Sequence, residues 1–301
     1  SEAKVIRQNR KIYKSAGAYT ASGYLIQRLQ EERAQAVLYL ITPTSNTIRS
    51  NFEYQVRQTD LRGKTYLTTV SSDKKYSDLY IRGEREWKEM EGSLVTIRQS
   101  VRTQGVTPGD LLAQYSEIIS TLSNFLTNII NESSGSAVMS FNILVRMKEV
   151  TSLTQAFMSV QLAGTSIRSE AINTFIGYIG QQQALRDMFE AVTPGEILFQ
   201  FHQTFPPTND ALVEYQNQII SNPDRVTVGS QAWAVVNDVR LAKLLNIQDT
   251  LSAMINQNSR NTLNRRTARI TVIILLIVFF WISSFGSAIL FAQTITGPWK
   301  R

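Results

Sequence analysis

The sequence predicts an all-α protein: two helical modules that share long first and last helices, followed by a C-terminal transmembrane helix. Three observations support this. Long stretches with few helix breakers carry apolar residues three and four positions apart, the spacing of an amphipathic helix. Strand-like alternation is nearly missing, since the run from Arg225 to Val228 is too short to count. An uncharged run, Ile270 to Ala292, is 23 residues long.

The expected helices follow one another with short breaks. The first ends near Pro43, and the fourth begins at Thr107-Pro108, because proline is well accommodated in a first helical turn. A short helical or irregular stretch lies between Pro194 and Pro207, and Asn222-Pro223-Asp224 breaks the chain once more. The predicted helices cover residues 4–42, 46–69, 77–103, 108–131, 136–162, 166–192 and 209–221, and a last helix runs from residue 230 toward the C-terminus.

The fourth helix has the clearest apolar pattern. Its apolar residues are spaced 4, 3, 4, 3 and 4, which is the heptad seam that helix bundles bury. They are Leu111, Tyr115, Ile118, Leu122, Phe125 and Ile129. The last helix keeps a similar phase through Trp233, Leu244, Ile247, Leu251 and Met254. We therefore expect both helices to pack in an apolar core.

Composition excludes several kinds of site. The chain has no cysteine and a single histidine, His202, so it has no disulfides, no cysteine-based metal site or nucleophile, and no multi-histidine metal site. No nucleophile elbow or glycine-rich phosphate loop occurs. The net charge is +7, but no nucleic-acid-binding module accompanies it. We expect no cofactor, no nucleic-acid partner and no catalytic activity in this part of the protein.

The run Ile270–Ala292 is long enough to cross a bilayer, because 23 residues of helix span about 35 Å. We therefore expect a cell-membrane protein with its sensor region outside, a lipid bilayer as a partner, and a further membrane helix before residue 1. The expected parts are an ectodomain (1–262), a transmembrane helix with a basic approach (263–293) and a cytoplasmic linker (294–301). Arg260, Arg265, Arg266 and Arg269 oppose this orientation, since positive residues favour the cytoplasmic side.

Three cations break the apolar pattern of their helices. Arg33 shares a face with Leu29 and Leu40, and Arg240 shares one with Trp233 and Leu244. Lys148 follows Phe141 and Val145 at helical spacing. A buried guanidinium costs several kcal/mol unless it is paired. Spacing leaves three explanations open: snorkelling of the charge to water, a carboxylate partner, or a bound small anion. The candidate carboxylates are Asp60, Glu149 and Asp238.

Four segments together resemble the nitrate- and nitrite-sensing (NIT) family over about residues 15–255. They are LQEERAQAVLYL (Leu29–Leu40), VRQTD (Val56–Asp60), VRMKEVTSLTQA (Val145–Ala156) and AWAVVNDVRLAKL (Ala232–Leu244). The resemblance implies two stacked up-and-down four-helix bundles and a nitrate or nitrite ion held among arginines. It also implies a dimeric receptor of the guanylyl cyclase, histidine kinase or chemoreceptor type. TITGPWKR (Thr294–Arg301) is similar to the start of a HAMP linker, so we expect cytoplasmic signalling machinery, a cyclase or kinase, to follow.

The residues that we expect to bind the anion are Arg33, Arg240, Arg57 and Lys148. The sequence also departs from the family pattern, because Thr154 and Gln155 stand where a second glutamate-arginine pair is expected. One expected anion-binding arginine is therefore absent, which puts the identity of the ligand in doubt.

The leading functional hypothesis is a sensor region that binds a small nitrate-like anion and passes a conformational change along its last helix. One alternative is a membrane-anchored helical bundle that docks partners and binds no small molecule. A lesser alternative is a protein that binds and delivers a small solute without signalling. Calorimetry with nitrate, nitrite and other small anions separates sensing from docking.

Overall fold

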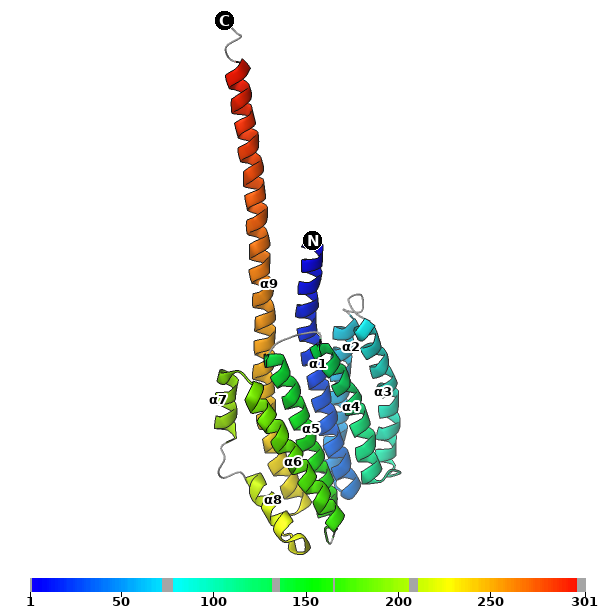
Figure 1. Cartoon of the computed structure of the whole chain (residues 1–301). Coiled ribbons are helices and arrows are strands. Elements are labelled where there is room, and N and C mark those ends of the chain that lie inside the picture. Colours follow the sequence, from blue (N-terminus) through cyan, green and yellow to red (C-terminus); the bar gives the residue numbers. More distant parts are fainter. Residues whose placement is uncertain (1, 72–77, 132–135, 165, 206–210, 297–301) are drawn as a thin grey trace. The chain divides into compact units, whose positions relative to one another are not determined.

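The protein is all-α, as predicted. The computed structural model describes residues 2–71, 78–131, 136–164, 166–205 and 211–296, and these residues contain helices and turns but no strand (Figure 1). In chain order the helices are α1 (Glu2–Ile41), α2 (Asn46–Ser71), α3 (Asp78–Arg102), α4 (Pro108–Asn131), α5 (Ser136–Leu162), α6 (Ser169–Val192), α7 (Gly195–Thr204), α8 (Ala211–Ser221), the short 3₁₀ helix η2 (Pro223–Arg225) and α9 (Ser230–Thr296).

The helix boundaries follow local chemistry. At the start of α4 the Thr107 hydroxyl accepts the backbone N–H of Asp110 at 3.2 Å and donates to the Asp110 carboxylate at 2.7 Å. This satisfies one of the N–H groups that a helix start leaves unpaired. The stretch between Pro194 and Pro207, for which the sequence allows either a helix or an irregular segment, contains α7. The short helix η2 lies directly after Asn222, at the break that the sequence predicts.

The chain divides into two compact units. One comprises Lys14–Asn256, and the other comprises Ser1–Tyr13 with Gln257–Arg301. Within the first unit, α2 packs on α3, α3 on α4, α4 on α5, α5 on α6, and α6 on α8. In the same unit α1 lies against α2, where the rings of Tyr39 and Phe52 stack 5.9 Å apart. The arrangement as two stacked four-helix bundles and the predicted boundaries at residues 262 and 293 stay predictions.

Two clusters of buried apolar side chains form the core of the unit Lys14–Asn256. The larger draws on α1 to α7 and α9, and the smaller centres on Phe175 and Trp233, whose rings meet edge to face at 5.7 Å. Burial of one large apolar side chain contributes about 1.5–3 kcal/mol. The predicted α4 seam lies in the larger cluster from Leu111 to Phe125, and Ile129 lies outside the described side chains.

The predicted membrane span is corrected by the structure. In the described part of the chain, no helix is both long and apolar enough to cross a membrane. The predicted location in a cell membrane with the sensor outside is therefore wrong on this finding, and the predicted transmembrane helix over Ile270–Ala292 is not found among the described residues. Within the run, the side chains of residues 271–273 and 275–277 are described. The rest of the run and residues 297–301 of the predicted linker lie outside the described side chains.

One glycine of α3 is required by close packing. A Cβ on Gly83 would lie 2.4 Å from Cε2 of Phe125, and the Phe125 ring is held edge to face against Tyr66 at 6.0 Å. Gly92, on the same helix, has no atom within 4 Å of its own Cβ position. The two glycines therefore differ in packing while sharing the same helix.

We expect Gly83→Ala to destabilise the protein by about 1–3 kcal/mol, because overpacking at Phe125 outweighs the gain in helix propensity. We expect Gly92→Ala to stabilise it by up to about 1 kcal/mol, since only the propensity changes. Urea denaturation of both variants measures the two free energies of unfolding. Equal effects at the two positions would contradict the packing of α3 on α4.

Candidate functional site

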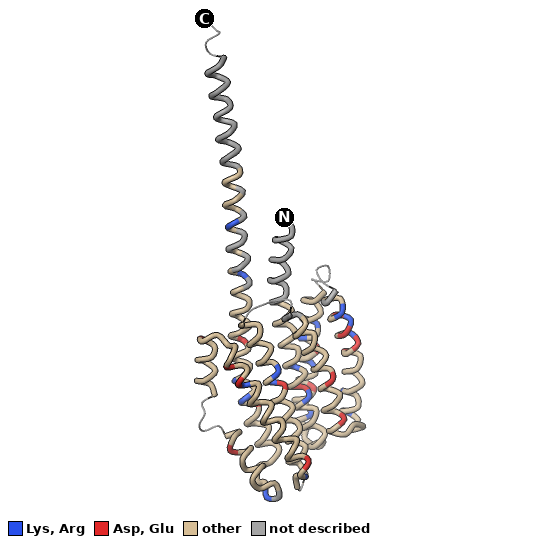
Figure 2. Tube along the Cα trace, viewed as in Figure 1, with Lys and Arg blue, Asp and Glu red and all other residues tan. Residues whose placement is uncertain are grey.

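Polar side chains are buried along the middle of α1. Gln30, Glu32 and Arg33 are each at most 2% exposed, although they lie on a helix whose other buried positions are mostly apolar. Figure 2 shows acidic and basic residues close to one another on the packed helices, in keeping with the ion pairs described below. Because a buried charge without a partner costs several kcal/mol, the partners of these residues define the candidate site.

Arg33 is held by two neighbouring helices. Its Nη1 donates to Oε1 of Glu149 on α5 at 2.7 Å, and its Nη2 donates to Oε2 of the same carboxylate at 3.1 Å. Nη1 also donates to the hydroxyl of Ser116 on α4, and Nη2 to that of Ser152 on α5. The Arg33 side chain is fully buried, and that of Glu149 is 21% exposed. The Nε of Arg33 is buried without a hydrogen-bond partner.

The Glu149 carboxylate is bound by a second residue of α1. Gln30 donates its Nε2 to Oε2 of Glu149 at 2.9 Å. The Ser152 hydroxyl in turn donates to the backbone carbonyl of Gln30 at 3.4 Å. Of the explanations that the spacing of Arg33 left open, the structure therefore shows an internal carboxylate partner.

Lys148 is buried beside α9. Its Nζ donates to Oε1 of Gln248 at 2.9 Å, and its side chain is 2% exposed. Burial lowers the pKa of Lys148 to about 7; nearby Glu31 and Asp249 oppose this lowering, and Arg28 adds to it. The Nε2 of Gln248 is itself buried without a hydrogen-bond partner.

We call two sets of residues, which meet at the adjacent positions 148 and 149 of α5, the polar layer. One set is Gln30, Arg33, Ser116, Glu149 and Ser152, and the other is Lys148 and Gln248. Two of the four predicted anion-binding residues, Arg33 and Lys148, lie in this layer. Arg57 is exposed on α2. Arg240 is half-buried on α9, with its guanidinium 5.6 Å from the ring centroid of Phe205, and it lines a pocket that includes neither Arg33 nor Lys148.

The departure from the family pattern at Gln155 is compensated by contacts inside the protein. The side-chain Nε2 of Gln155 donates to the backbone carbonyl of Ala234 at 3.0 Å and to Asp238 at 2.7 Å, and the backbone carbonyl of Gln155 accepts a hydrogen bond from Nε1 of Trp233 at 3.1 Å. This position therefore joins α5 to α9, and the candidate partner Asp238 is engaged here rather than with Arg33.

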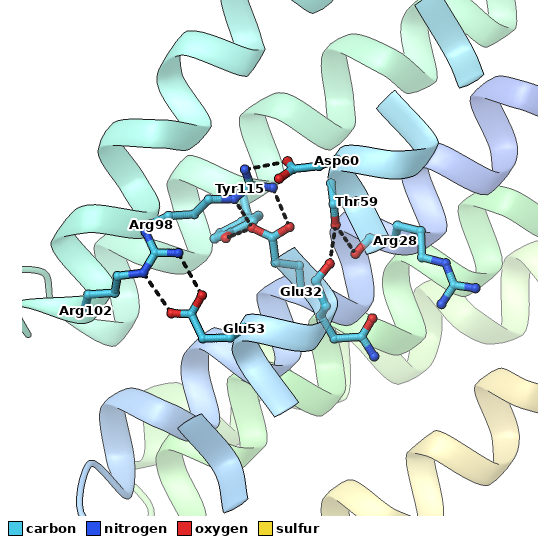
Figure 3. A network of polar contacts seen from close by, with 9 residues as sticks. Arg28, Glu32, Glu53, Thr59, Asp60, Arg98, Arg102 and Tyr115 are labelled. Carbon is cyan, nitrogen blue, oxygen red and sulfur yellow. Dashed lines mark hydrogen bonds and ion pairs between the residues drawn. The ribbon is translucent and has the colours of Figure 1, made fainter. Parts of the chain in front are cut away.

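A second buried network surrounds Glu32, on the side of α1 that faces α3 and α4 (Figure 3). Nε and Nη2 of Arg98 donate to the Glu32 carboxylate at 2.8 and 2.9 Å, and Nη1 of Arg98 donates to Asp60 at 2.8 Å. The hydroxyl of Tyr115 donates to Glu32 at 2.7 Å. Although burial alone lowers the pKa of Arg98, Glu32 and Asp60 together raise it above its usual value.

Sequence reasoning did not single out the Glu32 network. Its one usable signal is spacing, because Leu25, Leu29, Glu32 and Ala36 are separated by 4, 3 and 4 positions, so that Glu32 lies on an apolar face. The candidate partner Asp60 belongs to this network, which leaves Glu149 as the carboxylate of Arg33. No group of three possible metal ligands occurs among the residues that the structure describes.

Comparison with known proteins matches the sequence to a known family. The family described as nitrate and nitrite sensing matches residues 24–256. Among solved structures, the chain is similar to the NasR transcription antiterminator, with a TM-score of 0.79 and 15% sequence identity over 87% of this chain and 74% of that chain. At that identity the likeness shows a shared fold. No curated protein matches the sequence.

The energetic effect of burying the Glu32 network can be tested against an exposed ion pair of the same geometry. The buried pair is Arg98–Glu32, and the exposed pair is Arg102–Glu53 (Figure 3). Arg102 binds Glu53 through Nε and Nη2 at 2.8 and 2.9 Å, as Arg98 binds Glu32, but the exposed pair is about one-third accessible. We expect Glu32→Gln to lower the free energy of unfolding by about 3–5 kcal/mol and Glu53→Gln by at most about 1 kcal/mol. Urea denaturation measures both, and comparable losses would contradict the burial of Glu32.

The pKa of Lys148 predicts a pH dependence of stability. Its folded-state pKa of about 7 lies below the unfolded value of 10.5. Between these two pH values the Lys148 amine therefore binds more protons in the unfolded chain than in the folded protein. Stability contributed by this residue therefore rises with pH, by up to about 1.4 kcal/mol per pH unit. We expect Lys148→Met to flatten this rise in urea denaturation series between about pH 7 and 9. The same slope in both proteins would contradict a neutral buried amine.

Proposed function

Because the chain belongs to the nitrate- and nitrite-sensing family, we propose that it senses a small planar oxyanion, nitrate or nitrite, at Arg33 in the polar layer. The observation that supports this is the cradle around Arg33. A fully buried guanidinium directs both Nη groups at one carboxylate, and two serine hydroxyls complete the set of partners.

The chemistry of the cradle suits nitrate and nitrite. A guanidinium offers parallel N–H donors in a fixed fork, which matches two oxygen atoms of a planar anion. Carboxylate, nitrate and nitrite all present two such oxygens on a small planar group. The Glu149 carboxylate therefore occupies the position that the ligand would take, and the unpartnered Nε of Arg33 offers one more donor.

We infer that the anion acts by competition with Glu149. The Glu149 side chain is 21% exposed, so it has access to water when it leaves Arg33, whereas Arg33 is fully buried. Exchange of Glu149 for an anion would remove the contacts that Gln30 and Arg33 of α1 make with the Glu149 carboxylate of α5. The ligand would thereby shift the protein between two packings of α1 on α5, which is what a sensor requires.

In this proposal the chain works as the sensor region of a signalling protein and not as an enzyme. A homodimer and the two-bundle arrangement belong to the same proposal, since both come from the family resemblance. The alternative is a helical bundle that docks partner proteins and uses the Arg33–Glu149 pair only for stability. The two hypotheses differ in whether an anion competes with Glu149.

Isothermal titration calorimetry with nitrate and nitrite, in a buffer of large organic anions, tests the competition. We expect Arg33→Ala to abolish binding. We expect Glu149→Gln to tighten binding by about tenfold or more, because it removes the competing charge and leaves a buried cation for the anion to neutralise. Nitrate should also raise the melting temperature of Glu149→Gln more than that of the wild type.

Arg57→Ala is the matched control, since Arg57 is exposed and its removal changes the net charge by the same amount. Its nitrate affinity should equal that of the wild type. Weaker binding in Glu149→Gln, or unchanged binding in folded Arg33→Ala, would contradict the competition. Absence of heat with every anion in wild type and Glu149→Gln would favour the docking hypothesis.

A further inference from the structure

The outward face of α9 carries exposed apolar side chains in a regular series. Leu244 and Ile247 lie in the core, whereas Val235 and Val239 are 56% and 53% exposed. These valines belong to a series of exposed residues whose positions differ by 3, 4, 3 and 4, which is the heptad spacing by which one helix packs along another. We call the series the α9 seam, and its members are Ala232, Val235, Val239, Ala242 and Asn246.

The composition of the α9 seam favours a pair of helices. Val239 and Asn246 take the first position of successive heptads. A β-branched residue at this position is typical of two-stranded coiled coils, and a single asparagine there fixes the register of the two helices. The next heptad position is Asp249, whose carboxylate accepts the Tyr24 hydroxyl of the same chain, so the seam ends at Asn246.

Two opposite charges flank the α9 seam. Asp238 and Lys243 are exposed and lie five positions apart. In a parallel pair of helices, residues at this separation lie opposite each other across the seam and form interhelical ion pairs. Within the described part of its own chain, Asp238 accepts a hydrogen bond from Gln155, Lys243 lies over the ring of Phe205, and neither forms an ion pair. An antiparallel pair would instead bring Asp238 to Asp238 and Lys243 to Lys243, which is repulsive.

We propose that a second copy of this chain packs along the α9 seam, parallel and in register, and that Asp238 of each copy pairs with the partner's Lys243. The inference rests on the homodimer of the proposed function and names the surface that forms it. Nε2 of Gln155 donates to Asp238 at 2.7 Å, so the interface would contact α5, the helix that carries Glu149. The proposed exchange at Arg33 would thereby have a route to the second copy.

Disulfide cross-linking of the full chain tests the pairing, because the chain has no cysteine of its own. We expect Val235→Cys and Val239→Cys each to give a cross-linked dimer under mild oxidation, since each side chain meets its counterpart across a parallel seam. Val95→Cys is the matched control, at a valine of α3 that is 62% exposed and lies outside the seam. This control should run as a single chain on a denaturing, non-reducing gel.

Light scattering of the same chain without oxidation measures its association directly. We expect Val239→Glu to be monomeric, because it places two carboxylates at the centre of the seam, and Val95→Glu to remain dimeric. Lys243→Glu should raise the dimer dissociation constant by about fivefold or more, since two attractive pairs become repulsive. Adding Asp238→Lys should restore the affinity, which a local structural effect at position 243 would not allow. Melting temperatures establish that each variant is folded.

Cross-linking at both seam positions and not at Val95 would support the proposal. It is overturned if the wild type is monomeric, if either seam cysteine fails to cross-link, if Val95→Cys cross-links equally well, or if folded Val239→Glu remains dimeric. Nitrate calorimetry separates this test from that of Arg33. A seam-linked dimer that binds no nitrate contradicts the proposed sensing alone, whereas a monomeric wild type that binds nitrate contradicts the seam alone.

Discussion

The structure depends on the burial of two adjacent opposite charges, Glu32 and Arg33, in the middle of α1. Successive residues on a helix point about 100° apart, so these two side chains cannot share the same neighbours. Glu32 is satisfied by Arg98 of α3 and Tyr115 of α4, and Arg33 by Glu149 of α5. Each charge requires a partner on a different helix, which fixes the rotation of α1 among the helices around it.

The two ion pairs that α1 forms differ in how completely they are shielded from water. The Glu32–Arg98 pair is nearly inaccessible and is reinforced by a tyrosine hydroxyl, so it suits a permanent contact. The Arg33–Glu149 pair joins a fully buried cation to a carboxylate that reaches water. A pair of this second kind can be opened by an anion at lower cost, because only the carboxylate needs to be solvated again. Because of this contrast, the proposed sensing site is at Arg33 rather than at Arg98.

Lys148 adds a different constraint to α5. Its amine lies next to a neutral amide of α9, and burial brings its pKa to about 7. Neighbouring residues of α5 thus carry contacts to two different helices, with Glu149 bound to α1 and Lys148 bound to α9. Movement of Glu149 would therefore alter a helix that also contacts α9, and this continuity gives the proposed exchange at Arg33 a physical route to the last helix.

The sequence by itself determined the helices. Proline, glycine and capping positions located the ends of α2, α4 and α5 to within a few residues, and the 4–3–4 spacing on α4 identified side chains that are buried together. Periodicity also showed that Arg33 and Lys148 point inward, because a helix face follows from local geometry alone. The apolar run near the C-terminus was a poorer guide, since its composition predicted a membrane span that the described helices do not contain.

Only the tertiary structure decided which charge meets which. Asp60, Glu149 and Asp238 were equal candidates from spacing, and the fold assigned them to Arg98, Arg33 and Gln155 in turn. It likewise left Arg57 in solvent and set Arg240 in a separate pocket, although all four predicted site residues have basic side chains. The physical reason is that a helix's own sequence fixes the direction of a side chain relative to its axis, whereas a partner on another helix, 38 to 116 residues away in these pairs, depends on how the helices pack.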